Sequence, residues 1–308
     1  MHLEIRDLSK TYAGGVHALR DVSLTIPPGM YGLLGPNGAG KSTLMRILAT
    51  LQSPDSGSVR LIDPAPGGLG ELDVLRQRHE IRRTLGYLPQ DFGVYPNVSA
   101  ESLLDHFAIL EGIVDRRTRR ATVEALLRRT NLWETRRRNL GGYSGGMRQR
   151  FGVAVALLGE PKLMIVDEPT AGLDPAERVR FLNLLSELGE NSIVLLSTHI
   201  VEDVSELCTR MAIIDHGRIL LEAVPLEAVR SLQGRIWRRI LDRDAVAEVE
   251  REHPVISTRL LAGKTVVHVH GEARPGPGFE PVEPALADVY FSTMHGHLGQ
   301  RHIAQKAS

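Results

Sequence analysis

The pattern of hydrophobic and polar residues in the first two thirds of the chain changes several times between a strand-like and a helix-like period. Apolar positions alternate with polar ones or form short runs in three segments that are typical of strands: 3–8, 16–26 and 30–34. Apolar positions recur three and four residues apart in three segments that predict helices: 41–51, 101–113 and 118–132. Two unbroken apolar runs, 163–166 and 192–197, are typical of parallel strands covered on both faces, and a helical segment follows each. The pattern therefore predicts an α/β layer fold.

A boundary near Pro225 divides the chain into residues 1–224 and a small α/β module, residues 225–308. Beyond the boundary the pattern predicts a strand, a helix, two strands joined through Ala262-Gly263-Lys264, and a last helix, in these ranges: 234–241, 244–253, 255–271 and 285–296. In the larger part, the density of Pro and Gly between Asp63 and Asp73 predicts a surface loop.

Composition limits the class of protein. The 308 residues are 42% hydrophobic and 24% charged, which is ordinary for a globular protein with a sizeable core. Lys plus Arg and Asp plus Glu each total 37, so the charge balance gives no reason to expect nucleic acid or an acidic membrane surface as the partner. Cys208 is the only cysteine, which excludes an intrachain disulfide, and no apolar run approaches the ~20 residues that cross a bilayer. We expect a soluble protein in a reducing intracellular compartment.

Residues 35–43, "GPNGAGKST", match the phosphate-loop pattern G-x-x-x-x-G-K-[ST] between a predicted strand and a predicted helix. Gly38 and Gly40 let the backbone turn so that its N–H groups face the β- and γ-phosphates. Lys41 supplies a positive charge to them, and Ser42 offers a hydroxyl to Mg²⁺. The predicted nucleoside triphosphate site consists of Gly35, Pro36, Asn37, Gly38, Ala39, Gly40, Lys41, Ser42 and Thr43.

The segment "LMIVDEP" places two acids at the carboxyl end of a buried strand, where open α/β sheets bind their ligands. A buried carboxylate is costly unless it is paired or bound to metal, and holding the Mg²⁺ that Ser42 also touches gives Asp167 such a role. Glu168 follows directly, and we expect it to orient or deprotonate the water that attacks the γ-phosphate. The alternative is two acids that cap a turn before Pro169.

Two further residues, His199 and Gln90, are predicted to be functional only because the sequence also carries the phosphate loop and the two acids. His199 ends the strand "IVLLSTH", and its imidazole N–H is suited to bind the γ-phosphate. A lone histidine after a strand is more often structural. Gln90, in "GYLPQDF", follows a strand-like segment and is placed to reach the metal or the attacking water. We therefore predict Glu168, His199 and Gln90 as catalytic residues and Ser42, Gln90 and Asp167 as metal ligands.

Five motifs in order resemble those of the nucleotide-binding subunit of an ATP-binding cassette (ABC) transporter: "GPNGAGKST", "YLPQ", "YSGGMRQR", "LMIVDEPTAGLDP" and "STH". They are similar to the Walker A, Q-loop, signature, Walker B with D-loop, and switch-histidine motifs of that family, and the match covers residues 1–224. The resemblance implies a P-loop NTPase with a RecA-like α/β core, an antiparallel β subdomain and a helical subdomain at about 91–160, with ATP and Mg²⁺ as cofactors. It also implies that Tyr12 stacks on adenine. Tyr143 departs from the family, which most often has leucine there.

The segment "GGYSGGMRQR" opens a second predicted helix with serine and glycines, another arrangement suited to phosphate. In the family that the chain resembles, two cassettes pair head to tail, and each ATP lies between the Lys41 loop of one and the signature helix of the other. The resemblance implies that Ser144, Gly145 and Gly146 bind the nucleotide of the opposite subunit, and that Asp174 belongs to the loop crossing between subunits. The expected partner is a second copy of the chain or a homologous cassette.

The resemblance implies an ATPase that powers transport through a separate integral-membrane permease, with the chain held at the cytoplasmic face of the cell membrane. It lies closest to the bacterial exporter branch. The alternative is a soluble cassette ATPase acting on a ribosome or on DNA. Ribosome-acting members carry two cassettes in one chain and DNA-repair members carry a long coiled coil, and neither is present in this sequence.

The segment "DFGVYPNVSAES", residues 91–102, combines apolar and aromatic side chains with a turn at Pro96 and a helix start at Ser99. We predict that it lines the groove that receives an intracellular helix of the permease, with Phe92 and Tyr95 as anchors.

Four histidines in the C-terminal module raise a second hypothesis. His268 and His270 lie two apart on one face of a predicted strand, and His295 and His297 follow near the last helix. No Cys or acid is spaced to complete a tetrahedral zinc site, so exposed strand histidines are the favoured interpretation.

Overall fold

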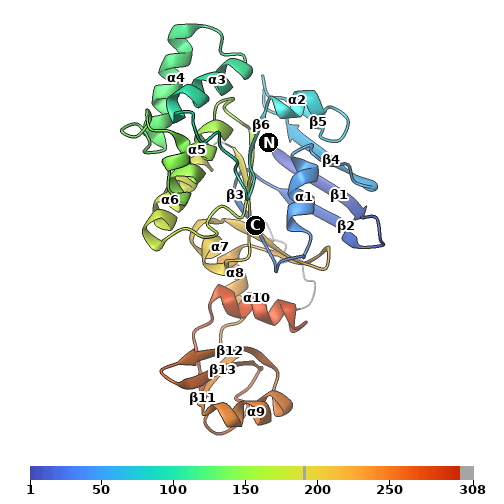
Figure 1. Ribbon diagram of the computed structural model, residues 1–308. Helices are drawn as coiled ribbons and strands as arrows, with labels where there is room; N and C mark the ends of the chain where they lie inside the picture. The colour runs from blue at the N-terminus through green and yellow to red at the C-terminus, as the bar shows by residue number, and fades with distance from the viewer. Residues whose placement is uncertain (190–191, 299–308) are drawn as a thin grey trace.

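The computed structural model describes residues 1–189 and 192–298, and its ribbon is shown in Figure 1. The strands of the described residues are β1 (His2–Thr11), β2 (His17–Ile26), β3 (Gly29–Leu34), β4 (Ser56–Asp63), β5 (Gly70–Asp73), β6 (Leu85–Leu88), β7 (Leu163–Asp167), β8 (Ile193–Thr198), β9 (Arg210–Asp215), β10 (Arg218–Ala223), β11 (Ile236–Leu241), β12 (Val255–Leu261), β13 (Lys264–His270) and β14 (Glu280–Pro281). The α-helices are α1 (Lys41–Leu48), α2 (Arg78–Arg82), α3 (Ala100–Leu110), α4 (Arg116–Arg129), α5 (Gly145–Ala156), α6 (Pro175–Leu188), α7 (Val201–Leu207), α8 (Pro225–Ser231), α9 (Val246–Glu252) and α10 (Leu286–Met294). None of these helices is long and apolar enough to span a bilayer.

The central sheet has the order β10-β9-β3-β8-β7-β6, and every neighbouring pair from β9 to β6 is parallel. The apolar runs at 163–166 and 192–197 fall in β7 and β8, whose residues are all buried. One face packs on α1 through Leu44 and Ile47, while the other packs on α6 and α7 through Phe181 and Val204. The predicted α/β layer fold is confirmed, and the parallel strands end together at one edge of the sheet.

A second sheet, of order β2-β1-β4-β5, is antiparallel and flanks α1 (Figure 1). Here the predicted loop between Asp63 and Asp73 is partly wrong, because Gly70–Asp73 forms β5 and pairs with β4. Leu72 packs against the core and Arg60 pairs with Glu71 at 2.7 Å. The density of Pro and Gly described only the connecting turn.

Helices α3, α4 and α5 form a lobe around a core of their own (Figure 1). Leu104, Leu127 and Phe151, one from each helix, are fully buried in it. Helix α3 begins where the sequence predicts, because Ser99 caps it by accepting a hydrogen bond from the Ser102 N–H at 3.2 Å.

The C-terminal module carries a sheet of order β12-β13-β11-β14. The strands predicted at 234–241 and 255–271 and the helices predicted at 244–253 and 285–296 are all present. Helix α10 does not stay with this sheet alone: Leu286 and Val289 are buried in the same cluster as Val204 of α7 and Ile213 of β9. Pro225 is itself buried at the start of α8. The module is thus packed against the larger part, residues 1–224, and residues 299–308 of the predicted range lie outside the described residues.

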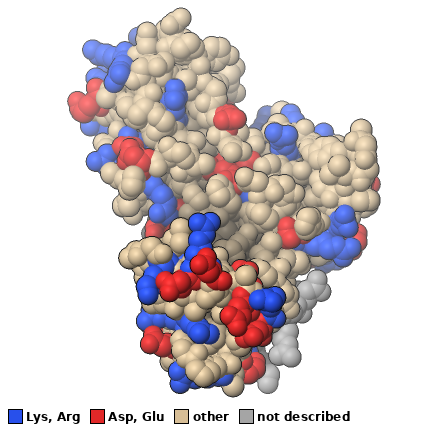
Figure 2. Space-filling view, turned by 60° about the horizontal axis from the view of Figure 1, so that its bottom comes forward, with Lys and Arg blue, Asp and Glu red and all other residues tan. Residues whose placement is uncertain are grey.

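Charges of both signs are mixed on the face that carries this module (Figure 2). Arg238 and Glu280, for example, lie 3.3 Å apart across β11 and β14. This face therefore shows the balance of charge found in the whole sequence.

Candidate functional site

The site forms where four neighbouring parallel strands end. Strands β3, β8, β7 and β6 adjoin in that order, with Leu34 opposite Thr198 and Asp167 opposite Ser197. The residues that follow their carboxyl ends are therefore brought together although they are far apart in the sequence. Those residues are Gly35, His199, Glu168 and, two positions beyond β6, Gln90.

The phosphate loop has little room for side chains. Gly40 precedes α1 with φ of 108°, and a Cβ there would lie 2.4 Å from the Ala18 carbonyl oxygen. A Cβ on Gly35 would lie 2.3 Å from the carbonyl oxygen of Ile214. Gly38 has φ of 82° with open space beside it, so conformation and not crowding favours glycine at that position. The glycines shape a backbone turn in front of the N-terminus of α1, which attracts anions.

Lys41 and Glu168 form a buried pair beside this loop. Lys41 is 4% exposed and Glu168 is 6% exposed, and Lys41 Nζ lies 3.1 Å from Glu168 Oε1. The ammonium also donates to the carbonyl oxygens of Gly35 at 2.7 Å and Pro36 at 3.1 Å. A buried carboxylate is tolerated here because a buried cation and hydrogen bonds offset its desolvation.

Glu168 also contacts the switch histidine. Its Oε2 forms a hydrogen bond with Nδ1 of His199, whose side chain is 44% exposed and so reaches the solvent. The backbone of Glu168 has φ of 49°, which costs about 1–2 kcal/mol for a residue other than glycine. Its N–H donates to the Ser197 carbonyl oxygen at 3.0 Å, which holds this conformation.

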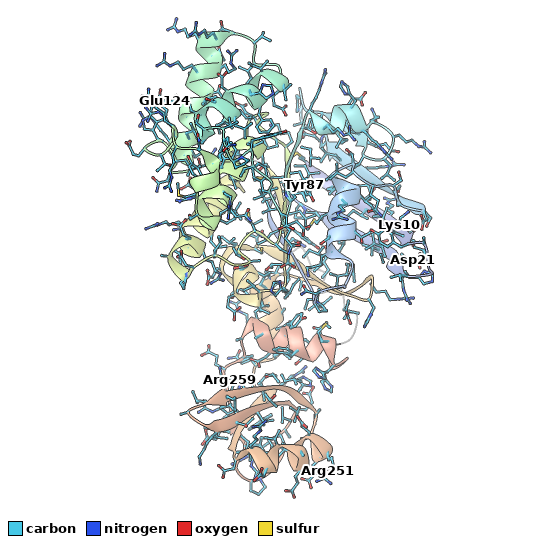
Figure 3. All side chains as sticks on the ribbon, in the orientation of Figure 1. Lys10, Asp21, Tyr87, Glu124, Arg251 and Arg259 are labelled. Carbon is cyan, nitrogen blue, oxygen red and sulfur yellow. The ribbon has the colours of Figure 1, made fainter. Side chains whose placement is uncertain are left out.

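Asp167 lies one residue earlier and is 3% exposed. It accepts a hydrogen bond from the Ser197 hydroxyl on β8. Its charge acts on the neighbouring strand, because burial first and the Asp167 carboxylate second raise the pKa of Tyr87. Tyr87 lies at the middle of the molecule (Figure 3).

A pocket of about 460 Å³ opens over the loop. It is lined by Tyr12, Val16, His17, Ala18, Pro36, Asn37, Gly38, Gly40, Lys41, Ser42, Thr43, Gln90 and Glu168. The structure thus brings together most of the predicted residues of the first half-site, with Asp167 behind them. Tyr12 is held by hydrogen bonds between its hydroxyl and Thr43 Oγ1, at 3.2 Å, and Gln52 Oε1, at 3.1 Å.

Val16, His17 and Ala18 line the same pocket and were not predicted from the sequence. Val16 precedes β2, His17 and Ala18 begin it, and no pattern in the sequence marks them as ligand-binding. Only the closure of the antiparallel sheet over α1 brings them there. The one available signal was their position just after Tyr12.

The predicted second half-site lies elsewhere. Ser144, Gly145, Gly146 and Asp174 are not among the residues that line the pocket. Ser144 caps α5, since its Oγ accepts from the Met147 N–H at 3.2 Å, and both Ser144 and Gly145 are exposed. A Cβ on Gly145 would meet nothing within 4 Å. Asp174 caps α6 in the same way, accepting from the Glu177 N–H at 2.9 Å.

The residues present fit a magnesium ion. Ser42, Gln90 and Asp167 offer only oxygen ligands, which Mg²⁺ prefers, and Mg²⁺ usually takes one or two protein ligands and completes its shell with phosphate and water. In residues 1–189 and 192–298, no three His, Cys, Asp or Glu side chains are grouped to hold a metal ion. A magnesium ion that takes most of its ligands from phosphate and water does not need such a group of side chains.

The interpretation of exposed histidines is wrong for the two strand residues His268 and His270, whereas His295 and His297 are exposed. His268 and His270 are half-buried, and His268 Nδ1 lies 2.7 Å from Asp288 Oδ1 on α10. His270 stacks on His297 with ring centroids 5.4 Å apart. Burial first, then the neighbouring His297 and Arg235, lower the pKa of His270. The acid that pairs with His268 comes from a separate helix, so sequence spacing did not reveal it.

Comparisons with known proteins agree with this geometry. Residues 19–171 match the family described as ABC transporter. The daunorubicin/doxorubicin resistance ATP-binding protein DrrA of Streptomyces peucetius is 34% identical over 276 residues, which cover 89% of this chain and 78% of that protein. The probable multidrug ABC transporter ATP-binding protein YbhF of Escherichia coli is 30% identical over 317 residues, covering 96% of this chain and 52% of that protein, so the chain spans about half of it.

A solved structure gives the same result for the fold. The dimeric post-hydrolysis state of the ATP-binding cassette MJ0796, bound to ADP and Pi, superposes with a TM-score of 0.64 and 25% identity, over 72% of this chain and 98% of that chain. Fold, phosphate loop and sequence relatives agree, and the chain belongs to the ABC transporter family as an ATP-hydrolysing, ATP-binding subunit.

Proposed function

We propose that this chain powers export through a separate integral-membrane permease and is held by that permease at the cytoplasmic face of the cell membrane. The relatives named for drug resistance and multidrug transport support this direction. In this proposal the permease selects the substrate, and the pocket over the phosphate loop binds ATP.

The contact of Glu168 with both Lys41 and His199 carries the catalytic part of the proposal. Lys41 and the loop N–H groups bind the β- and γ-phosphates, and Tyr12 stacks on adenine. Glu168 orients and deprotonates the attacking water. His199 holds the carboxylate in place and reaches the γ-phosphate with its exposed edge, while Gln90 contacts the water or the metal from β6.

Magnesium bound with ATP would neutralise charge that develops on the phosphates during transfer. Ser42, Asp167 and Gln90 would hold it. The hydrogen bond from Ser197 fixes the Asp167 carboxylate for this purpose.

The signature residues act on a second subunit in this proposal. Ser144 and Gly145 are exposed at the N-terminus of α5, away from the pocket of their own chain. A head-to-tail pair of chains would place that helix end against the γ-phosphate bound by Lys41 of the other chain, with Asp174 between the subunits. MJ0796, which is similar in fold, was solved as a dimer.

Reconstitution tests the proposal. The chain is co-expressed with a candidate permease, purified as a complex and placed in inside-out vesicles. ATP-dependent accumulation of the permease's substrate inside the vesicles is expected for export. Accumulation only in right-side-out vesicles with enclosed ATP indicates import, and co-sedimentation of the chain with ribosomes in place of a membrane complex would support the alternative function.

A further inference from the structure

Asp203 is fully buried on the first turn of α7, at 0% exposure. Its Oδ2 accepts hydrogen bonds from the hydroxyls of Thr170 at 2.5 Å and Thr198 at 3.1 Å. Its Oδ1 accepts from Arg178 Nε at 2.8 Å, and a second guanidinium nitrogen lies 2.7 Å from the same oxygen as an ion pair. One carboxylate therefore connects four segments of the chain.

Two partners of Asp203 lie close in the sequence to residues of the candidate site, and the third lies on the helix that Asp174 caps. Thr170 lies two positions after Glu168, and Thr198 immediately precedes His199. Arg178 lies on the first turn of α6, the helix that Asp174 caps. The network consequently reaches the attacking-water residue, the switch histidine and the loop expected to cross between subunits.

The polar groups of this network are paired with one another. An unpaired buried carboxylate would be costly, and here a cation and two hydroxyls satisfy it. Partial burial disfavours the charge on Arg178, but the hydrogen bond and the negative charge of Asp203 outweigh burial and raise the pKa of Arg178. The Thr198 hydroxyl also accepts from the Ile200 N–H at 2.9 Å, so it fixes the backbone on both sides of His199.

Apolar contacts also hold helix α7 in the core. Helix α7 already packs through Val204 among apolar residues that include Ile213 and Leu196. Apolar packing tolerates small displacements, whereas the hydrogen bonds of Asp203 define direction as well as distance. The contact between Glu168 and His199 joins the ends of two separate strands, so its geometry depends on contacts that fix both direction and distance.

We propose that Asp203 is a positioning residue for ATP hydrolysis: it sets the Glu168 and His199 segments relative to each other through Thr170 and Thr198, and sets the Asp174 loop through Arg178. The inference rests on the roles proposed above for Glu168 and His199. Asp203 is fully buried and is not among the residues that line the pocket, so we expect its loss to affect turnover and to spare nucleotide affinity.

The experiment compares Asp203→Ala with Glu206→Gln in the full chain. Glu206 lies on the same helix and also faces Arg178, at 3.9 Å, but it is 53% exposed. We expect Asp203→Ala to lower kcat by about tenfold or more while KM for ATP changes less than about threefold, and Glu206→Gln to leave both unchanged. Unchanged kcat in folded Asp203→Ala protein, or an equal loss in Glu206→Gln, would overturn the proposal.

Two further variants separate positioning from plain destabilisation. Thr170→Val is close to isosteric and removes only one hydroxyl from the network, so it should lower kcat even if Asp203→Ala does not fold. In the Glu168→Gln background, Asp203→Ala should add little further loss to single-turnover hydrolysis, because both changes act on one step. A fully additive loss, or normal kcat in Thr170→Val, contradicts positioning. If Glu168→Gln alone leaves hydrolysis unchanged, the proposed role of Glu168 fails instead.

Discussion

Lys41 Nζ lies 3.1 Å from Glu168 Oε1, so the phosphate-binding cation and the proposed catalytic base are in direct contact. Bound phosphate would compete for Lys41 and release Glu168 toward the attacking water. We therefore expect Glu168→Gln to preserve ATP binding and to lower kcat by roughly 10² to 10⁴, because the amide keeps the shape but loses the basic carboxylate. Turnover and nucleotide affinity measure this. Glu124→Gln is the matched control: Glu124 forms an ion pair with Arg128 on α4, remote from Tyr87 and the site (Figure 3). Wild-type turnover in Glu168→Gln would remove Glu168 from its role.

A second prediction concerns Ser144, the exposed residue that caps α5. Ser144→Arg should leave ATP affinity of the monomer nearly unchanged and abolish ATP-induced dimerisation, because the side chain would project where the opposite γ-phosphate approaches. Losing the cap costs about 1 kcal/mol of stability, so Ser144→Ala serves as the control for that effect.

Mixing Ser144→Arg with Lys41→Ala chains sharpens this test. In a mixed dimer one composite site carries both substitutions and the other carries neither, so one intact site is restored. Nucleotide-dependent cross-linking should recover in the mixture. Loss of ATP binding by monomeric Ser144→Arg would instead show that the signature helix belongs to the pocket of its own chain.

The permease groove predicted at residues 91–102 has one exposed anchor. Tyr95 is 65% exposed, whereas Phe92 packs against Phe151 with ring centroids 6.1 Å apart. A charge at Phe92 would disturb the helical lobe itself, so Tyr95→Glu is the informative variant. We expect it to weaken complex formation with the permease and to leave the ATPase activity of the isolated chain unchanged. Complete assembly of the Tyr95→Glu complex would place the groove elsewhere.

Cys208 reports on unfolding. Burial raises the pKa of its thiol to about 12, from an ordinary value near 9. The folded thiol keeps its proton while the unfolded thiol loses it, so this contribution to stability is present below pH 9 and is lost as pH rises above 9. At pH 8.5 we expect iodoacetamide to modify Cys208 only at the rate of local or global opening, and urea to accelerate it strongly. Rapid modification of native protein would show that Cys208 is accessible.

Because α10 packs on α7, we expect the C-terminal module to unfold together with residues 1–224. Leu286 is 4% exposed in the cluster that contains Val204, so Leu286→Ala should lower the free energy of unfolding by about 2–5 kcal/mol. Leu260→Ala, at a side chain that is 78% exposed, is the matched control and should change it little. A single urea transition shifted by Leu286→Ala is expected. Two transitions, with only the smaller one shifted, would mean that the module unfolds independently.

Local chemistry let the sequence predict the phosphate loop and the acids after β7. Glycines that permit a tight turn, Lys41 and Ser42 lie within nine residues, and Asp167 and Glu168 end an apolar run that is typical of a buried strand. Patterns of this kind need no distant partner to be recognised. The signature segment also predicted the start of its helix, because a serine before glycines is an N-terminal cap signal.

Only the tertiary structure decided which residues meet. Parallel pairing of β3, β8, β7 and β6 brings Gly35, His199, Glu168 and Gln90 to one edge, and the strand order depends on packing across the whole sheet. Val16 lines the pocket because the antiparallel sheet closes over α1. In the sequence, Asp203 looks like one more acid on a surface helix, and no neighbouring residue marks the partner of Asp288. Their partners Thr170, Arg178 and His268 lie 20 or more residues away, and contacts at such separations are set by the fold and not by local pattern.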